Sequence, residues 1–161
     1  MQQIKAGKPL TVTDPRMTRF MMSIDDAVDL VLYSFQHGAP GDIFVQKAPG
    51  ATIDTLALAL KRVFSADNPI QVIGTRPGEK AYETLVNREE MVRAEDLGRY
   101  YRIPADSRDL DYDRYFTGGQ PCITEAKEYN SSNTTQLSVD ELVETLLRLH
   151  YIRTELEGRT A

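Results

Sequence analysis

Two arginines and one glutamate are placed where they could bind a phosphorylated ligand. Arg19 follows the turn-forming pair at 14–15, and Arg76 opens the run R-P-G-E-K, in which Glu79 is the fourth residue. A guanidinium is a planar fork of donors, so two converging arginines would hold a diphosphate, and the carboxylate could accept hydrogen bonds from a ribose. On spacing alone, the alternative stays open that these are solvated surface arginines in weak ion pairs.

The sequence contains none of the common motifs for catalysis, cofactors or metals. It lacks a G-x-x-x-x-G-K-S/T loop and a glycine fingerprint after a strand, so we predict no cofactor site in this chain. Lys80 and Tyr82 stand in the wrong order for a Tyr-x-x-x-Lys pair. His37 and His150 are far apart, and Cys122 is the single cysteine. We therefore predict no catalytic residue, no metal ligand and no disulfide.

Composition narrows the possible partners. The 161 residues are 41% hydrophobic, which is typical of a globular protein, and the net charge is −5. General nucleic-acid binding needs a basic surface, so no nucleic-acid partner is predicted. The longest apolar runs fall far short of the roughly 20 residues of a membrane span, and the first residues lack a secretion signal. We predict a cytoplasmic protein with no membrane partner.

The first part of the chain alternates predicted strands and helices. The β-prone runs are 10–13, 18–22, 42–46 and 70–73. Helical spacing of apolar residues follows Ser23, with Asp26 completing a cap, and follows Thr52 as far as Phe64. The apolar run 42–46 is typical of a buried strand in a parallel sheet. This order predicts an α/β fold.

After residue 87 the pattern changes. Residues 88–161 are rich in charges, aromatics and turn formers, and they end in a helix that begins at Ser138 with Glu141 as its capping partner and runs through Ile152. We predict two parts: an α/β part over 1–87, which the family resemblance given below implies binds a nucleotide sugar, and an irregular extension over 88–161. The sequence assigns no role to residues 129–137.

Four motifs in order resemble a known family. They are G-K-P-L-T-V-T-D-P-R-M-T-R-F at 7–20, G-D-I-F-V-Q-K-A-P at 41–49, R-P-G-E-K at 76–80 and E-Y-N-S-S-N-T at 128–134. Together they resemble the bacterial UDP-N-acetylglucosamine 4,6-dehydratase/5-epimerases of capsule and O-antigen biosynthesis, which are extended short-chain dehydrogenase/reductases. In that family an NADP-binding Rossmann half comes first, and the last third binds the nucleotide sugar. The chain resembles only this last part.

The resemblance implies roles for particular residues. Arg19 and Arg76 would contact the diphosphate of UDP, Glu79 the uridine ribose, and Leu10, Val12 and Thr13 the uracil. A complete enzyme would use NADP to dehydrate and epimerise a UDP-N-acetylhexosamine and would form homo-oligomers. The chain alone would lack catalysis, and its partner would be the missing N-terminal Rossmann half.

Three interpretations remain open at this point: a piece of such an enzyme, a stand-alone UDP-sugar-binding or regulatory module, or one half of a split enzyme. A neighbouring reading frame that encodes a glycine fingerprint would distinguish them. If the chain lacks the sheet on which helix 24–35 should pack, that helix should expose Ile24, Val28, Val31 and Phe35.

Overall fold

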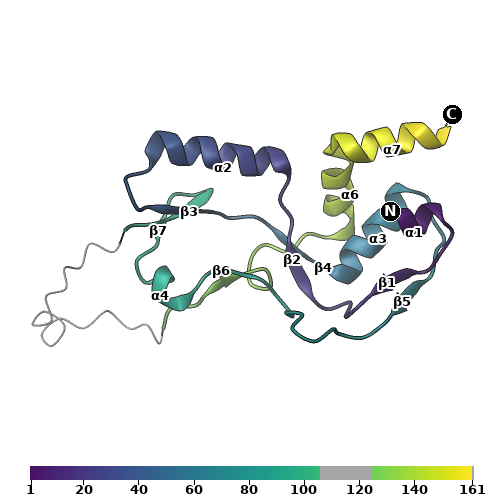
Figure 1. Ribbon diagram of the computed structural model, residues 1–161, viewed down its shortest axis with the longest axis horizontal. Coiled ribbons are helices and arrows are strands. Elements are labelled where there is room, and N and C mark those ends of the chain that lie inside the picture. The colour runs from purple at the N-terminus through teal and green to yellow at the C-terminus, as the bar shows by residue number, and fades with distance from the viewer. Residues whose placement is uncertain (106–124, 161) are drawn as a thin grey trace, which may run out of the picture. The chain divides into compact units, whose positions relative to one another are not determined.

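The computed structural model describes residues 1–105 and 125–160, which belong to two compact units (Figure 1). The first unit is formed by Met1–Met21, Pro49–Glu83 and Ser131–Ala161, and the second by Met22–Ala48 and Thr84–Asn130. Each unit is therefore built from separate stretches of the chain. Within the described residues, no helix combines the length and the apolar character needed to cross a membrane.

The first unit contains two small pairs of strands. Its elements are helices α1 (Gln2–Lys5), α3 (Ile53–Val63), α6 (Val139–Arg148) and α7 (His150–Thr160), and strands β1 (Leu10–Val12), β2 (Thr18–Phe20), β4 (Gly50–Thr52) and β5 (Ile70–Val72). Strand β1 pairs with β5 in parallel, and β2 pairs with β4 antiparallel. The strands predicted at 10–13, 18–22 and 70–73 are confirmed, as is the α/β class.

Helix α3 carries the core of the first unit. Thr52 caps it as predicted, because its Oγ1 accepts a hydrogen bond of 3.0 Å from the Thr55 N–H. Apolar side chains gather in two clusters: Ile4, Leu10, Val12, Ala57, Phe64 and Ile152 in one, and Ala51, Ala59, Leu142 and Leu146 in the other. The first cluster fixes β1 on α3, and the second fixes α6 on α3.

The C-terminal helix differs from the prediction. Ser138 and Glu141 form the expected capping box, but the single helix predicted through Ile152 is wrong: Leu149 has an extended ψ of 123° and separates α6 from α7. Leu149 packs against both core clusters. The break at this residue lets α6 bury Leu142 and Leu146 in one cluster while α7 buries Ile152 in the other.

The second unit is antiparallel. Its elements are helices α2 (Ile24–His37) and α4 (Arg88–Met91), and strands β3 (Ile43–Gln46), β6 (Thr84–Val86), β7 (Glu95–Asp96), β8 (Tyr100–Ile103) and β9 (Tyr129–Asn130). One sheet has the order β3-β8-β7, and β6 pairs with β9. The prediction of a buried strand in a parallel sheet at 42–46 is wrong, because β3 pairs antiparallel with β8 and Ile43 is exposed.

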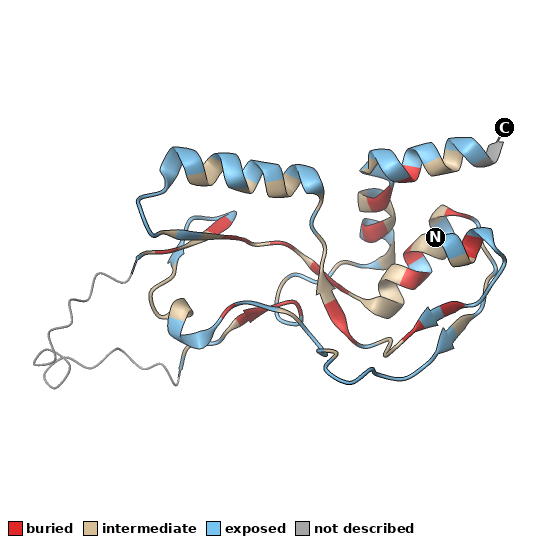
Figure 2. Cartoon of the chain, in the orientation of Figure 1, coloured by how far each residue is buried: buried red, intermediate tan, exposed pale blue. Residues whose placement is uncertain are grey.

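Helix α2 lies along one face of this sheet, and the side of the helix that points away from the sheet is exposed (Figures 1 and 2). The Ser23 and Asp26 capping box forms as predicted. Tyr33 stacks on Tyr100 of β8, with 4.3 Å between ring centroids. The predicted apolar stripe is exposed at every position: Ile24, Val28, Val31 and Phe35, joined by Leu32. We call these five side chains the α2 stripe.

Candidate functional site

Glu79 links the ends of two neighbouring strands. One carboxylate oxygen, Oε1, accepts a hydrogen bond of 2.9 Å from the Thr13 hydroxyl, and the other, Oε2, accepts one of 3.2 Å from the Arg76 backbone N–H. Thr13 comes directly after β1, and Arg76 lies on the loop that leaves β5. Because β1 and β5 are parallel, their carboxyl ends meet at one edge, where α/β proteins commonly bind ligands.

Glu79 is surrounded by groups that favour its ionised form. The hydrogen bonds from the Arg76 N–H and the Thr13 hydroxyl lower the pKa of Glu79 below its usual value, and the positive charges of Arg19 and Arg76 lower this pKa further. Glu79 is therefore ionised at neutral pH. The structure groups Thr13, Arg19, Arg76 and Glu79 in one cluster, in which Thr13 and Arg76 donate hydrogen bonds to Glu79 and Arg19 acts on it through its charge.

Contacts within the chain hold the Arg19 side chain in place. Arg19 is the middle residue of β2, and its side chain is 26% exposed. Its Nη1 donates to the Thr18 carbonyl at 2.7 Å and its Nη2 to the Lys80 carbonyl at 3.0 Å, while its Nε lies 3.7 Å from a Glu83 carboxylate oxygen. Nη2 also donates to the Met17 sulfur at 4.0 Å. Of the five N–H donors of the guanidinium, these contacts leave one, on Nη1, for a phosphate.

Arg76 lies on an exposed loop whose shape depends on local contacts. Gly78 has φ +80°, a conformation in which residues with a side chain are strained. The Glu79 N–H donates to the Arg76 carbonyl at 3.1 Å, so a turn closes beneath the Arg76 side chain. The run R-P-G-E-K thus forms a tight turn that presents one guanidinium and one carboxylate.

Leu10 and Val12 differ from Thr13 in orientation. Both side chains are buried in the cluster between β1 and α3. A contact of these two residues with uracil would have to involve their backbone atoms, and it stays a prediction. Thr13 is the member of the predicted uracil strand whose side chain joins the Glu79 cluster.

Sequence reasoning missed the groups that support Arg19. Lys80 is the last residue of R-P-G-E-K and Glu83 lies three residues beyond it, so a signal was available there. Ser131 was also missed. It is a fully buried polar residue, and its hydroxyl accepts a hydrogen bond from the Glu83 N–H at 3.0 Å. Its only sequence signal is its place within the motif at 128–134.

Among the described residues, the starts of helices α2, α3 and α6 do not fit a dinucleotide cofactor such as NADP. A pyrophosphate needs free backbone N–H groups at a helix N-terminus. At α2 and α6 the side chains of Asp26 and Glu141 already occupy the first turn. At α3 the first N–H groups donate to the Met17 carbonyl at 2.8 Å and the Pro15 carbonyl at 3.0 Å. Residues 1–105 and 125–160 also contain no cluster of three metal-ligating side chains.

Comparison with known proteins places the chain among polysaccharide biosynthesis proteins. The family model described as "Polysaccharide biosynthesis protein" matches residues 1–105, and "Polysaccharide biosynthesis protein C-terminal" matches residues 106–153. Proteins named UDP-glucose 4-epimerase from Rickettsia felis and Rickettsia typhi are 54% and 55% identical over 158 residues. These alignments cover 98% of this chain but 46% of each relative, so the chain spans about half their length.

A solved structure agrees with this grouping. The X-ray structure of Pen from Bacillus thuringiensis superimposes with a TM-score of 0.72 at 29% sequence identity, over 91% of this chain and 42% of that one. The α/β elements correspond to the C-terminal part of a larger enzyme of the short-chain dehydrogenase/reductase type. Because the first family model alone matches well over half of the residues, the chain belongs to the polysaccharide biosynthesis protein family.

Proposed function

We propose that the chain binds the UDP moiety of a nucleotide sugar at the Thr13, Arg19, Arg76 and Glu79 cluster. The single observation that carries the proposal is the Glu79 carboxylate, which is fixed between two strand ends and lies within the field of both guanidinium groups. A nucleoside diphosphate has the matching order of groups: an anionic diphosphate for the arginines and a neutral ribose diol for the carboxylate.

The hydrogen-bonding capacity of the cluster supports this orientation. An ionised carboxylate has about four acceptor sites, and Thr13 and Arg76 occupy one on each oxygen of Glu79. The remaining sites can accept hydrogen bonds from ribose hydroxyls. A phosphate beside Glu79 would meet like charge, so the diphosphate belongs on the side of Arg19 and Arg76.

The finer proposal is that the complete protein is a UDP-N-acetylglucosamine 4,6-dehydratase/5-epimerase for capsule or O-antigen polysaccharide. Support comes from the four motifs and from the polysaccharide biosynthesis family. Within such an enzyme, this part would hold UDP, so that remote binding energy positions the hexose for reaction. NADP would supply the hydride chemistry, and it would be held by a Rossmann half, because the starts of the described helices α2, α3 and α6 do not fit it.

The α2 stripe supports the existence of that partner half. Its apolar side chains lie in solvent, where each forfeits part of the roughly 1.5–3 kcal/mol that full burial contributes. A protein part that covered this face would recover that free energy. We propose that the cover is the N-terminal Rossmann half, that the complete enzyme is a cytoplasmic homo-oligomer, and that its substrate is a UDP-N-acetylhexosamine.

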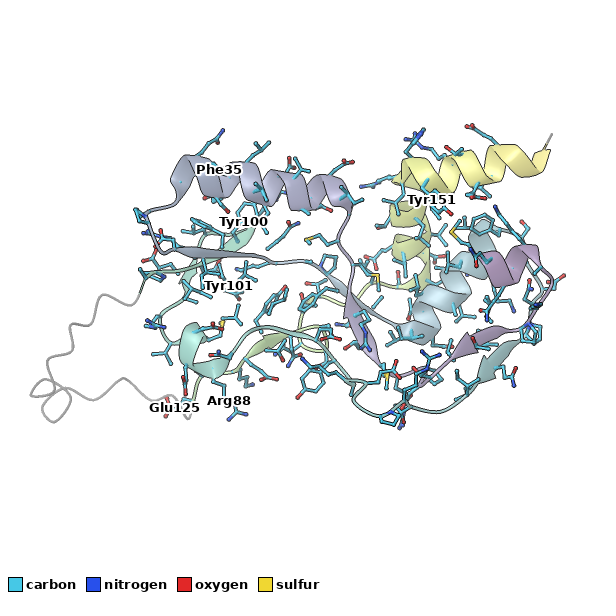
Figure 3. The ribbon with its side chains drawn as sticks, viewed as in Figure 1. Phe35, Arg88, Tyr100, Tyr101, Glu125 and Tyr151 are labelled. Carbon is cyan, nitrogen blue, oxygen red and sulfur yellow. The ribbon has the colours of Figure 1, made fainter. Side chains whose placement is uncertain are left out.

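Calorimetric titration of UDP into the chain tests the site. Arg76→Ala and Arg19→Ala should each weaken binding by about 1.5–3 kcal/mol, the range for a lost hydrogen bond to a charged group. Arg88→Ala is the matched control, because this exposed arginine lies on α4 of the second unit (Figure 3). Equal losses in all three variants would contradict the site. Parallel titrations with UDP-N-acetylglucosamine and UDP-glucose test which sugar is preferred.

A further inference from the structure

Ser131 is a buried hydroxyl whose hydrogen-bonding capacity is fully used. Its side chain has no exposed area. Its Oγ donates to the Thr18 carbonyl at 3.0 Å, and it accepts from the Glu83 N–H at 3.0 Å and from the Thr18 hydroxyl at 2.8 Å. A serine hydroxyl has one donor and two acceptor sites, and all three are occupied. The Ser131 N–H also donates to the Glu83 carbonyl at 2.8 Å.

The partners of Ser131 are the same residues that hold the Arg19 guanidinium. The Thr18 carbonyl has two lone pairs, one of which accepts from Ser131 Oγ and the other from Arg19 Nη1 at 2.7 Å. Glu83, whose backbone is tied to Ser131 at both N–H and C=O, places its carboxylate 3.7 Å from Arg19 Nε. Ser131 therefore sets the spacing between two groups that contact Arg19.

The surrounding backbone keeps Ser131 from shifting. Gln136 Nε2 donates to the Ser131 carbonyl at 2.8 Å. The Gly50 N–H donates to the Thr135 carbonyl, and the Leu137 N–H donates to the Gly50 carbonyl, both at 2.8 Å. Residues 131–137 are thereby attached to β4, the partner strand of β2, which carries Arg19. Strand β2, which contains Arg19, and residues 131–137 are therefore joined through β4 in one hydrogen-bonded network.

From this geometry we propose that Ser131 is a positioning residue for Arg19, and that it orients the guanidinium toward the diphosphate without touching the ligand. The proposal rests on the proposed UDP site. Because Ser131 is wholly buried, its effect must pass through Thr18 and Glu83. Its loss should therefore weaken recognition of the diphosphate and leave recognition of the nucleoside unchanged. This assigns a function to the motif at 128–134.

The test compares UDP with uridine on the full chain by calorimetry, with competition titrations for the weaker ligand. Ser131→Ala should weaken UDP binding by about three- to tenfold, the equivalent of one net hydrogen bond, and uridine binding by less than about twofold. Arg19→Ala should reduce the preference for UDP further, and adding Ser131→Ala to it should change nothing more. Ser34→Ala, which removes a 2.7 Å hydrogen bond from a hydroxyl to the Leu30 carbonyl in α2, is the control and should leave both affinities unchanged.

The outcomes separate this proposal from the proposed function. If Arg19→Ala lowers the preference for UDP but Ser131→Ala does not, the positioning role is wrong and the UDP site stands. If Ser131→Ala weakens both ligands equally, Ser131 is only structural. If Arg19→Ala itself leaves the preference unchanged, the UDP site is wrong and the positioning role falls with it. If circular dichroism shows that Ser131→Ala does not fold, Thr18→Val, which removes the hydroxyl that donates to Ser131, replaces it. The same comparison of UDP and uridine affinities then tests the positioning role.

Discussion

The α2 stripe and the core clusters should lose very different amounts of stability when an apolar side chain is removed. Phe35 is 84% exposed, so only about a sixth of its side chain is buried in the chain. Full burial contributes roughly 1.5–3 kcal/mol, so Phe35→Ala should lower the free energy of unfolding by about 0.2–0.5 kcal/mol. The higher helix propensity of alanine offsets part of this loss. The net change should lie near zero.

Leu142 provides the contrast. It is 1% exposed and lies between α6 and α3 in the cluster with Ala51, Ala59 and Leu146. Removing a buried leucine side chain costs about 2–5 kcal/mol, because the lost burial and the remaining cavity add. For a chain of this length that loss corresponds to a Tm lower by about 4–20 °C, against about 2 °C or less for Phe35→Ala.

Thermal and urea denaturation followed by circular dichroism measures both changes. The chain should be dilute, because an exposed apolar face promotes association at higher concentration. Size-exclusion chromatography over a concentration series should show self-association of the wild type, which Phe35→Ala reduces and co-expression with an N-terminal Rossmann half relieves. A loss above about 1.5 kcal/mol for Phe35→Ala in the dilute monomer would refute the reasoning, as would a wild-type monomer that melts cooperatively above about 60 °C.

Three further predictions concern the backbone, the pH response and the cofactor. Gly50→Ala should destabilise the chain by about 1–3 kcal/mol in urea denaturation, because a Cβ there would lie 2.5 Å from the Ser131 carbonyl oxygen, whereas Gly158→Ala in α7, which meets no atom within 4 Å, should be neutral or stabilising. The pKa of Glu79 is lowered in the folded chain, so its ionised form stabilises the fold above the ordinary value of 4.5, and this contribution is lost as the pH falls through the folded pKa. The difference in Tm between the wild type and Glu79→Gln should therefore be constant above about pH 4.5 and shift only below it; a shift confined to neutral pH would exclude this cause. The chain alone should neither bind NADP(H) in fluorescence titrations nor convert UDP-N-acetylglucosamine in a product assay, and measurable 4,6-dehydration would contradict the assignment of the cofactor to another part.

Local features could be predicted from the sequence, and long-range ones could not. The caps at Ser23, Thr52 and Ser138 depend on residues three positions away, so each was visible in the sequence. The antiparallel pairing of β3 was not, because an apolar run looks the same beside either kind of neighbour. The break at Leu149 was hidden because helical spacing continues across it.

The site shows the same division. Arg76 and Glu79 are three residues apart, and their grouping followed from one motif. The hydrogen bond from Thr13 to Glu79 joins residues 66 positions apart, and the pairing of β1 with β5 creates it. Ser131 reaches Thr18 over 113 positions, so nothing near it in the sequence pointed to its partners. The family resemblance identified the motif at 128–134 but gave no structural role for Ser131.

The interleaved segments of the first unit set the order in which it can be completed during synthesis. Strands β2 and β4 leave the ribosome early, but Ser131 and helix α6 follow only after the whole of Thr84–Asn130 has been made. Until then the nascent chain contains Arg19 without the hydrogen bonds of Ser131 to its neighbours, and it contains α3 without α6, the helix that covers Ala59. Chain elongation at roughly 5–20 residues per second makes this interval several seconds long. A ribosome that stalls within it would present an apolar helix face to chaperones and proteases, so the abundance of the protein should depend on how quickly residues 84–148 are translated.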